Sequence, residues 1–507
     1  MVGAEKTGVF LCTCDKKLNI NFKEIAGEIK NKVKFVEIVD KLCTPEGQGY
    51  IAQHLRWRDE RRPEKLVIAA CNTKTFDELL KKYEFDRENM ILENIREHCA
   101  WVYKERNEAT EKARAIVKCG VVKARYMKKP EPIKVTINRS IALVGSQGLA
   151  TAPMLENFGA SLHLIQSEGY LKRGFKAAKF NFYPASEVLD ISGRLGNFKV
   201  TLKRKKYIDM QKCISCDACV AVCPKKAIYS PEDALFSSYA ISEKCDKCEA
   251  CIKVCQVDAV NLEEKTEEIK VGQVLYSSDC TAVLRAASNL TDRKRESLIR
   301  ADLKKCANAG LKEKKLNITG CSYCNAACAY SAISYGDVDE LSCVGCGICV
   351  SACPQGVLQM RSLPEEEMFS LIEAALDTEL SPKILLFSCM EQDATLQAAG
   401  MRKIDCPSPA TLFVPCIGMV SDVHILRAFD LGAEGVLLLG CKECMYGNGV
   451  SEAAKTAEFC RQLMGALGAE KERIKIIDGD ADAPQKFAYA VSNFVRSLNS
   501  MPALGLG

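Results

Sequence analysis

Two cysteine runs with the same spacing constrain this chain more than any other feature of its sequence. Each reads Cys-x2-Cys-x2-Cys-x3-Cys. In such a run three thiolates bind one cubane iron–sulfur cluster, and the fourth binds the cluster of the other run. The two predicted ligand sets are Cys213, Cys216, Cys219 and Cys255, and Cys245, Cys248, Cys251 and Cys223. Residues 206–265 are therefore predicted to form a small electron-transfer domain with two [4Fe–4S] clusters.

Zinc is the alternative for these residues, because paired cysteines also suit that metal. A zinc site takes four ligands from two such pairs, which gives no reason for eight thiols in two identical runs. Iron–sulfur ligation is therefore the favoured interpretation, and the domain is expected to be of the bacterial ferredoxin type.

The chain has 29 cysteines among its 507 residues. Disulfides would explain them in a secreted protein, but no signal peptide is recognised at the N-terminus, and no apolar run has the length of a transmembrane segment. We therefore expect a cytoplasmic protein of an anaerobe whose thiols bind metal. The formal net charge of +5 omits the negative charge of cluster thiolates. Basic stretches lack aromatic interleaving, so no nucleic-acid partner is expected.

Residues 1–130 contain apolar runs that each end in a cysteine and are separated by helical patterns. This order predicts a parallel α/β sheet, whose sites lie at the carboxyl ends of the strands. Cysteines at those ends would converge, and we predict a further cluster there, with buried structural thiols as the alternative. Its candidate ligands are Cys12, Cys43, Cys71 and Cys99, with Cys14 competing with Cys12.

The next segment has the order of a dinucleotide-binding βαβ unit, but its fingerprint is damaged. Gly145 and Gly148 are present, whereas Gln147 replaces the glycine that lets a pyrophosphate approach. Gln166 stands where an acidic residue would bind the ribose. Residues 138–205 and 266–305 are therefore predicted to form a degenerate Rossmann-like remnant without a working nucleotide site, completed by a return strand at 268–278.

Residues 306–362 contain a second pair of cysteine runs, one of which is incomplete. The complete run supplies, with Cys328, the predicted ligand set Cys343, Cys346, Cys349 and Cys328. The other run has Ile318 at its first position and leaves Cys321, Cys324 and Cys353 for the second cluster. Cys306 is the first candidate for the missing ligand. A three-iron cluster and a site open to a non-protein ligand remain as alternatives.

Residues 380–500 repeat the pattern of buried strands that end in cysteine. The candidate ligands are Cys389, Cys416, Cys441 and Cys444. Four thiolates at one edge of a parallel sheet suit a [2Fe–2S] cluster, and apolar packing cysteines are the alternative. Cys119, Cys406 and Cys460 are assigned a structural role.

The order of these parts resembles the A subunit of heterodisulfide reductase, joined to a domain similar to the delta subunit of methyl-viologen-reducing hydrogenase. Residues 8–14 and 94–101 resemble N-terminal segments of the first family, and residues 383–389 and 429–441 resemble the second. The resemblance implies FAD in the reductase-like part and a [2Fe–2S] cluster in the last domain.

Several residues depart from these families. Besides Gln147 and Gln166, residues 275–278 replace an Ala-Thr-Gly turn that the resemblance places beside the flavin, so we do not expect FAD. Gln392 stands where the delta-subunit family has a second cysteine after Cys389.

The predicted fold is multidomain, α/β plus α+β. It has parallel-sheet α/β end domains, the Rossmann-like remnant and two ferredoxin-like domains. We expect about four to five [4Fe–4S] clusters and one [2Fe–2S] cluster. The predicted function is electron relay between other subunits of a heterodisulfide-reductase-like or hydrogenase-like complex, without a reaction of its own. The alternatives are a FAD- or NAD-binding oxidoreductase subunit with a residual nucleotide site, and a reductive activator or cluster carrier for another metalloenzyme.

Overall fold

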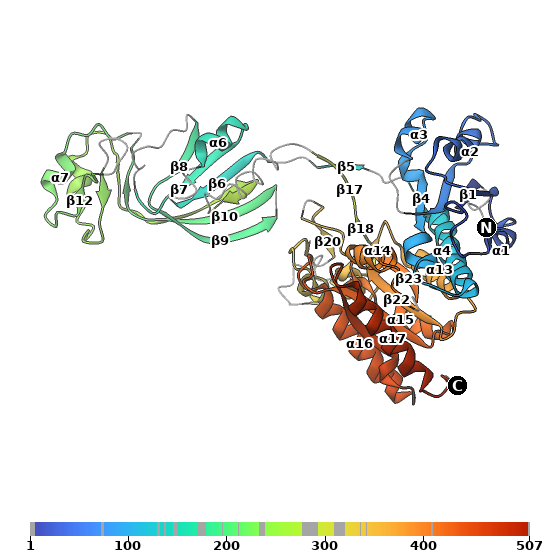
Figure 1. Ribbon diagram of the computed structural model, residues 1–507. Coiled ribbons are helices and arrows are strands. Elements are labelled where there is room, and N and C mark those ends of the chain that lie inside the picture. The colour runs from blue at the N-terminus through green and yellow to red at the C-terminus, as the bar shows by residue number, and fades with distance from the viewer. Residues whose placement is uncertain are drawn as a thin grey trace. The chain divides into compact units, whose positions relative to one another are not determined.

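The computed structural model of the chain divides into two compact units, residues 132–296 and residues 1–131 together with 297–507 (Figure 1). The described residues are 6–71, 76–128, 132–135, 138–145, 151–169, 179–194, 196–210, 212–232, 239–275, 293–308, 320–334, 336–340, 342–406 and 409–504. Among them, no helix is long and apolar enough to cross a membrane.

The N-terminal part is a parallel four-stranded sheet in the order β2-β1-β3-β4. The strands are β1 (Thr7–Cys12), β2 (Phe35–Val39), β3 (Lys65–Ala70) and β4 (Met90–Asn94). The helices are α1 (Phe22–Ile29), α2 (Pro45–Leu55), α3 (Asp77–Lys82), the short η2 (Arg87–Asn89), the π-helix η3 (Arg96–Ala100) and α4 (Arg106–Tyr126). Strands β1 and β3 are almost wholly buried, as their continuous apolar sequences predict for a sheet covered on both faces.

The C-terminal part is a second parallel sheet, in the order β23-β22-β24-β25. Its strands are β22 (Ile384–Cys389), β23 (Ala410–Val414), β24 (Gly435–Cys441) and β25 (Ile474–Gly479). Its helices are η5 (Met390–Gln392), α14 (Asp393–Met401), η6 (Ile417–Met419), α15 (Asp422–Asp430), α16 (Gly449–Ala466), η7 (Lys471–Arg473) and α17 (Pro484–Asn499). The two parallel sheets agree with the predicted α/β end domains.

The second ferredoxin region lies in the same unit. Its elements are β18 (Ile299–Ala301), η4 (Leu303–Lys305), α11 (Tyr323–Ala327), β19 (Ile333–Ser334), β20 (Asp337–Val338), α12 (Ile348–Ser351) and β21 (Leu358–Met360). Strand β18 pairs with β21 in antiparallel register. Residues 299–301, expected within the Rossmann-like segment 266–305, therefore belong to the ferredoxin sheet, because their hydrogen-bonding partner lies there.

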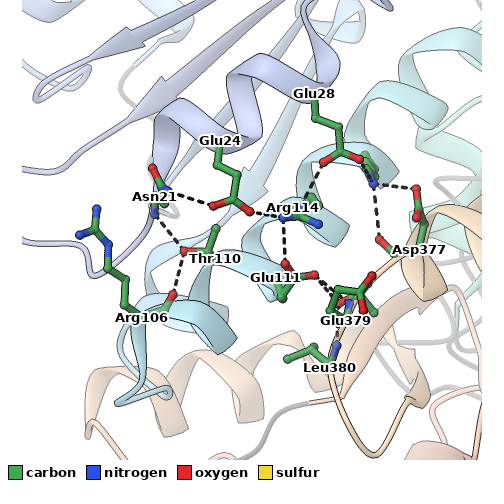
Figure 2. A network of polar contacts seen from close by, with 12 residues as sticks. Asn21, Glu24, Glu28, Arg106, Thr110, Glu111, Arg114, Asp377, Glu379 and Leu380 are labelled. Atoms are coloured by element: carbon green, nitrogen blue, oxygen red, sulfur yellow. Dashed lines mark hydrogen bonds and ion pairs between the residues drawn. The ribbon is translucent and has the colours of Figure 1, made fainter.

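Helix α13 (Glu365–Leu376) and the turn that follows it join the two end domains. Figure 2 shows the ion pairs at this junction. Arg114 of α4 pairs with Glu24, with Glu28 at 3.1 Å and with Glu111 at 2.8 Å. The Lys118 ammonium lies 2.5 Å from Glu28 and 2.6 Å from Asp377, which follows α13. One charge network therefore connects α1, α4 and the segment after α13.

Residues 132–296 form the other unit. Its parallel sheet has the order β16-β6-β7-β8, and its antiparallel sheet has the order β15-β10-β9. The parallel strands are β6 (Ser140–Val144), β7 (Ser161–Ile165), β8 (Phe180–Tyr183) and β16 (Gln273–Leu275), and the helix is α6 (Ala152–Asn157). The antiparallel strands are β9 (Ser186–Arg194), β10 (Asn197–Arg204) and β15 (Lys265–Val271), and a further antiparallel pair joins β5 (Pro132–Val135) to β17 (Arg293–Glu296).

Residues 268–275 of the predicted return strand at 268–278 are divided between these two sheets, and residues 276–278 lie outside the described residues. Strand β15 pairs antiparallel with β10, whereas β16 pairs parallel with β6. Gly272 separates them where the chain passes Asn138, since a β-carbon there would lie 1.8 Å from the Asn138 carbonyl oxygen. The period-2 pattern of the sequence continues through this turn and does not reveal the change of sheet.

The first ferredoxin region also belongs to this unit. It consists of β11 (Tyr207–Ile208), α7 (Ala218–Val222), β12 (Ile228–Tyr229), β13 (Ala240–Ile241), α8 (Ala250–Val254) and β14 (Val260–Asn261). Strand β11 pairs with β14 and β12 pairs with β13, so each small sheet joins the two halves of the motif.

Candidate iron–sulfur sites

The three complete cysteine runs share one local backbone conformation. The residues on both sides of the second cysteine lie in the left-handed region, as Asp217 (φ 58°) and Glu249 (φ 62°) illustrate. Gly347 (φ 78°) takes this role in the run that ends at Cys353. Left-handed backbone is uncommon outside glycine and is found at sites that need a special chain direction. A short helix, α7, α8 or α12, begins directly after each of these residues.

In the first ferredoxin region, the four cysteines predicted for one cluster line a single small cavity of about 20 Å³. They are Cys213, Cys216, Cys219 and Cys255, so a cysteine of the second run joins three of the first. In the other predicted set, burial raises the pKa of Cys251, and the nearby Cys245 and Cys223 thiols raise it further. The thiols of each predicted set are therefore close enough to influence one another.

The second ferredoxin region has two cavities of similar size, one for each predicted ligand set. A cavity of about 20 Å³ is lined by Cys328, Cys343, Cys346 and Cys349. The other, also of about 20 Å³, is lined by Cys306, Cys321, Cys324 and Cys353. Cys306, which follows η4, thus lies at the incomplete run, although it is outside the motif. Ile318 lies outside the described residues.

The incomplete run differs from the others in its backbone. Ser322 follows Cys321, which stands at the second position of the run, and has φ −124° instead of a left-handed value. A left-handed residue turns the chain so that three thiols of one run face the same cluster site. In this run only two thiols, Cys321 and Cys324, are predicted to face that site. The altered backbone is consistent with a third thiol that arrives from Cys306.

Backbone N–H groups point at the last cysteine of three runs. The amide of Ala227 donates to Cys223 Sγ at 3.2 Å, that of Ala259 to Cys255 Sγ at 3.2 Å, and that of Ala332 to Cys328 Sγ at 3.3 Å. Thiolates accept such bonds, and hydrogen bonds to sulfur are one of the means by which proteins set cluster potentials. Half-buried thiols with N–H donors aimed at them fit iron–sulfur ligation.

Four cysteines also converge at the carboxyl edge of the C-terminal sheet. The Cys389 thiol is hydrogen-bonded to Cys416 and Cys441, and the Cys416 donor lowers the pKa of Cys389 to about 7. The amide of Ile417 donates to Cys389 Sγ at 3.2 Å, and the amide of Gly418 donates to Cys416 Sγ at 3.4 Å. The fourth member is Cys444, whose charge raises the pKa of Cys416 and Cys441.

The second ferredoxin region packs directly on this edge. Ser351 donates to the Gly418 carbonyl at 2.7 Å, Tyr330 to the Met445 carbonyl at 2.9 Å, and Asn448 to the Ala327 carbonyl at 2.9 Å. Buried Ile348 lies within the same hydrophobic core as Cys416 and Cys441. The interface is therefore both apolar and hydrogen-bonded.

Three sites of this unit, namely the Cys306 site, the Cys343 site and the C-terminal site, follow one another in space. Burial is the main cause that raises the pKa of Cys349, and the Cys324 charge of the Cys306 site adds to it. The pKa of Cys346 is likewise raised by burial and also by Cys444 of the C-terminal site. The Cys343 site thus lies between the Cys306 site and the C-terminal site.

The N-terminal sheet brings Cys12, Cys14, Cys43 and Cys71 together. The pKa of Cys12 is raised by burial and by Cys14 and Cys43, and that of Cys71 by burial and by Cys14 and Cys12. Arg96 Nη1 donates to Cys14 Sγ at 3.6 Å and also lowers the pKa of Cys71. The sequence pattern does not single out Arg96, because only the π-helix η3 turns it toward these thiols.

Cys99 does not join this group, contrary to the prediction. It is fully buried, and its Sγ donates to the Ala109 carbonyl at 3.0 Å. It packs with Val9 and Leu11, whereas Cys12 packs in the cluster of Phe10. The reason is that Cys99 lies within η3 and not at a strand end, so it faces α4.

The predicted nucleotide segment shows one described feature that bears on binding. Gln166 is buried, its Nε2 donates to the Ile165 carbonyl at 3.3 Å, and its main-chain N–H donates to the Tyr183 carbonyl at 3.2 Å. Its Nε2 is therefore engaged within the sheet, whereas its buried Oε1 has no hydrogen-bond partner among the described residues. Gly145 has φ 73°, as a turn after β6 requires, and Gln147 and Gly148 lie outside the described residues.

The cysteines assigned to structure are buried. Burial raises the pKa of Cys119, Cys406 and Cys460 to about 12, and the first of them donates to the Leu371 carbonyl at 3.8 Å. In the part of the chain that the structure describes, no group of three or more His, Cys, Asp or Glu side chains is arranged to hold a single metal ion.

Comparison with known proteins matches three parts of the chain to known families. Residues 384–502 match the family model of the methyl-viologen-reducing hydrogenase, delta subunit. Residues 205–256 match the 4Fe-4S dicluster domain, and residues 337–359 match the 4Fe-4S binding domain. The chain is 28% identical over 264 residues to a protein of Archaeoglobus profundus named as like the A subunit of heterodisulfide reductase, covering 44% of this chain and 36% of that protein.

Two further relatives carry related names. The iron-sulfur A 1 subunit of the CoB–CoM heterodisulfide reductase of Methanopyrus kandleri is 30% identical over 329 residues, 54% of this chain and 49% of that protein. The A subunit of the ferredoxin:CoB-CoM heterodisulfide reductase of Methanosarcina mazei is 27% identical over 333 residues, 54% of this chain and 41% of that protein. The predicted resemblance to both families is confirmed. The chain spans less than half the length of these three curated relatives.

Proposed function

We propose that this chain is an iron–sulfur electron-transfer subunit of a heterodisulfide-reductase-like complex. It relays electrons between partner subunits and carries no flavin of its own. The observation that carries the proposal is the series of three four-cysteine sites within one compact unit. Relatives named as A subunits of heterodisulfide reductases and a matched hydrogenase delta-subunit domain support it.

The proposed cofactors are five [4Fe–4S] clusters and one [2Fe–2S] cluster. The cubane sites are the two of the first ferredoxin region, the two of the second, and the N-terminal group of Cys12, Cys14, Cys43 and Cys71. The [2Fe–2S] site is the C-terminal group. When bound, such clusters exchange one electron at a time without a change of ligands.

The chain's own residues would make this exchange efficient by fixing the sites relative to one another. Hydrogen bonds from Ser351 and Tyr330 hold the second ferredoxin region on the carboxyl edge of the C-terminal sheet. Buried Ile348, in the helix that carries Cys349, excludes water from this contact. Electrons that arrive at the C-terminal site would reach the Cys343 site next and the Cys306 site after it, or pass in reverse.

The proposed absence of flavin rests on the nucleotide segment. Gln166 uses its amide within the sheet, and it has no carboxylate for ribose hydroxyls. Without a hydride-accepting cofactor, the reaction that consumes the electrons would belong to a partner subunit. The proposed partners are other subunits of a heterodisulfide-reductase-like or hydrogenase-like complex.

Anaerobic purification with iron, sulfide and flavin analysis, followed by an EPR-monitored redox titration, tests this proposal. We expect iron for about five cubane clusters and one binuclear cluster, and no flavin. Stoichiometric FAD, or iron well below about four clusters' worth, would refute it.

A comparison of two variants tests the proposed order of electron transfer. Cys346→Ser should remove the middle site and slow reduction of the Cys306 site from a donor that reduces the C-terminal site. Cys460→Ser alters a buried thiol outside the sites and should leave that rate unchanged. Equal rates in the two variants would contradict the proposed order.

A further inference from the structure

Gln392 is a buried polar residue beside the C-terminal cysteine site. It ends the short helix η5, which begins directly after Cys389, and only 8% of its surface is exposed. Cys441 pairs in the sheet with Gly479, against whose backbone the Gln392 amide lies. Burial raises the pKa of the Cys441 thiol, and a hydrogen bond from the Gln392 amide opposes that rise. Burying an amide costs free energy unless its hydrogen bonds are made, so the partners of the Gln392 amide determine its orientation.

Two neighbours determine which end of the amide faces the sulfur. Thr395 Oγ1 lies 2.8 Å from Gln392 Oε1, and a hydroxyl can donate to that oxygen. A thiolate can only accept, so the NH2 group of the amide must face Cys441. Both contacts are satisfied by one orientation, with the oxygen on Thr395 and the nitrogen on Cys441.

Gly479, the last residue of β25, fixes the position of the same amide. A β-carbon at Gly479 would lie 1.6 Å from Gln392 Oε1 and 2.4 Å from its Cδ. Any larger residue there would displace the glutamine. The carboxyl end of β25 therefore leaves a space that the Gln392 side chain occupies.

Gln392 completes a set of N–H donors at this site. The amide of Ile417 donates to Cys389, and the amide of Gly418 donates to Cys416. With Gln392 facing Cys441, the sulfurs of all three cysteines at or just after a strand end have an N–H partner. Main-chain donors cannot be removed by a side-chain substitution. The Gln392 amide is the side-chain donor of this set.

We infer that Gln392 is a positioning residue that sets the reduction potential of the C-terminal cluster. An N–H···S bond stabilises the more negative, reduced state, so this donor raises the potential. Electrons would then reside at the C-terminal site in preference to the adjacent Cys343 site. The inference rests on the proposed function, because it requires a cluster held by Cys389, Cys416, Cys441 and Cys444.

The test compares Gln392→Met with Gln397→Met in the full-length chain, purified anaerobically with its clusters. Methionine keeps the length of the side chain and removes the N–H donor. Gln397 lies on the neighbouring helix α14 and donates to Asp393 at 2.6 Å, so it serves as the matched control. EPR-monitored redox titration should give a lower midpoint potential for the C-terminal cluster in Gln392→Met alone, with unchanged iron content and unchanged ferredoxin signals.

Thr395→Val provides a second, independent variant. It removes the hydroxyl that holds Gln392 Oε1, and we expect a smaller shift of the same potential in the same direction. An unchanged potential in both variants would overturn the inference. Loss of the C-terminal signal with its iron in Gln392→Met would also overturn it, because Gln392 would then be required to retain the cluster. A wild-type chain without that signal would instead refute the proposed [2Fe–2S] site, and the inference with it.

Discussion

Gly449 offers a direct test of the C-terminal site, because two of the four sulfurs lie against its backbone. It is the first residue of helix α16. A β-carbon at this position would lie 2.2 Å from Cys416 Sγ and 2.8 Å from Cys444 Sγ. Both distances are well below van der Waals contact, so Gly449→Ala must move the sulfurs or the start of the helix.

The size of the effect follows from two opposing terms. Alanine is favoured over glycine within a helix by about 0.5–1 kcal/mol. Overpacking of a close-packed site costs about 1–3 kcal/mol. The sulfurs belong to loops fixed by η6 and by the ferredoxin contact, so the clash should dominate. We expect a net loss of about 1–2 kcal/mol in the free energy of unfolding, together with loss of the C-terminal cluster.

Gly49→Ala is the matched control. Gly49 lies within helix α2, and a β-carbon there would meet no atom within 4 Å. It should stabilise the chain by about 0.5–1 kcal/mol without altering any cluster signal. Chemical denaturation, iron analysis and EPR of the two variants provide the measurement. Gly449→Ala with full iron, an unchanged C-terminal signal and control-like stability would refute the assigned arrangement of Cys416 and Cys444.

Two other substitutions test separate parts of the same unit. Cys306→Ala should convert one cubane cluster to a three-iron form or abolish it, which lowers the iron content by about one to four atoms per chain. The control variant Cys460→Ala should retain all iron. Equal iron content in the two variants would exclude Cys306 as a ligand. Burial raises the pKa of Glu367 from 4.5 to about 7 despite nearby Lys123 and Lys65. Ionisation of this buried carboxyl therefore lowers the free energy of unfolding progressively as the pH rises from 4.5 to 7, and the full loss remains above pH 7. Glu367→Gln should therefore stabilise the chain at pH 8 by up to about 3 kcal/mol and have little effect near pH 4.5; a stabilisation that is the same at both pH values would contradict this origin.

Much of the site architecture could be predicted from cysteine spacing and buried-strand patterns. Cys12, Cys389 and Cys441 each end an apolar run, and a parallel sheet brings such ends to one edge by its geometry. The crossed pairing of Cys255 with the first run likewise follows from the motif, and these cysteines line one cavity. Local sequence is informative here because the short motif itself fixes the chain path.

The remaining features depend on contacts that sequence patterns do not encode. Cys99 follows a strand, but the π-helix η3 turns it away from the edge and turns Arg96 toward Cys14. The pairing of β18 with β21 joins residues far apart in the sequence, and it carries Cys306 to the incomplete run. Neither contact can be inferred from composition or from cysteine spacing.

The fusion of the ferredoxin region with the C-terminal domain has a consequence for electron transfer. In an encounter between separate proteins, the distance between two clusters depends on a transient interface, which is typically small and wet. Here Cys346 and Cys444 pack against one hydrophobic core, which includes Ile348, a residue only 1% exposed. Tyr330 and Ser351 add hydrogen bonds across the same contact. The distance between the two sites is therefore set by folding and not by binding. For the proposed clusters, the rate of electron transfer between the two sites should be independent of protein concentration, and only exchange with the proposed partner subunits should vary with it.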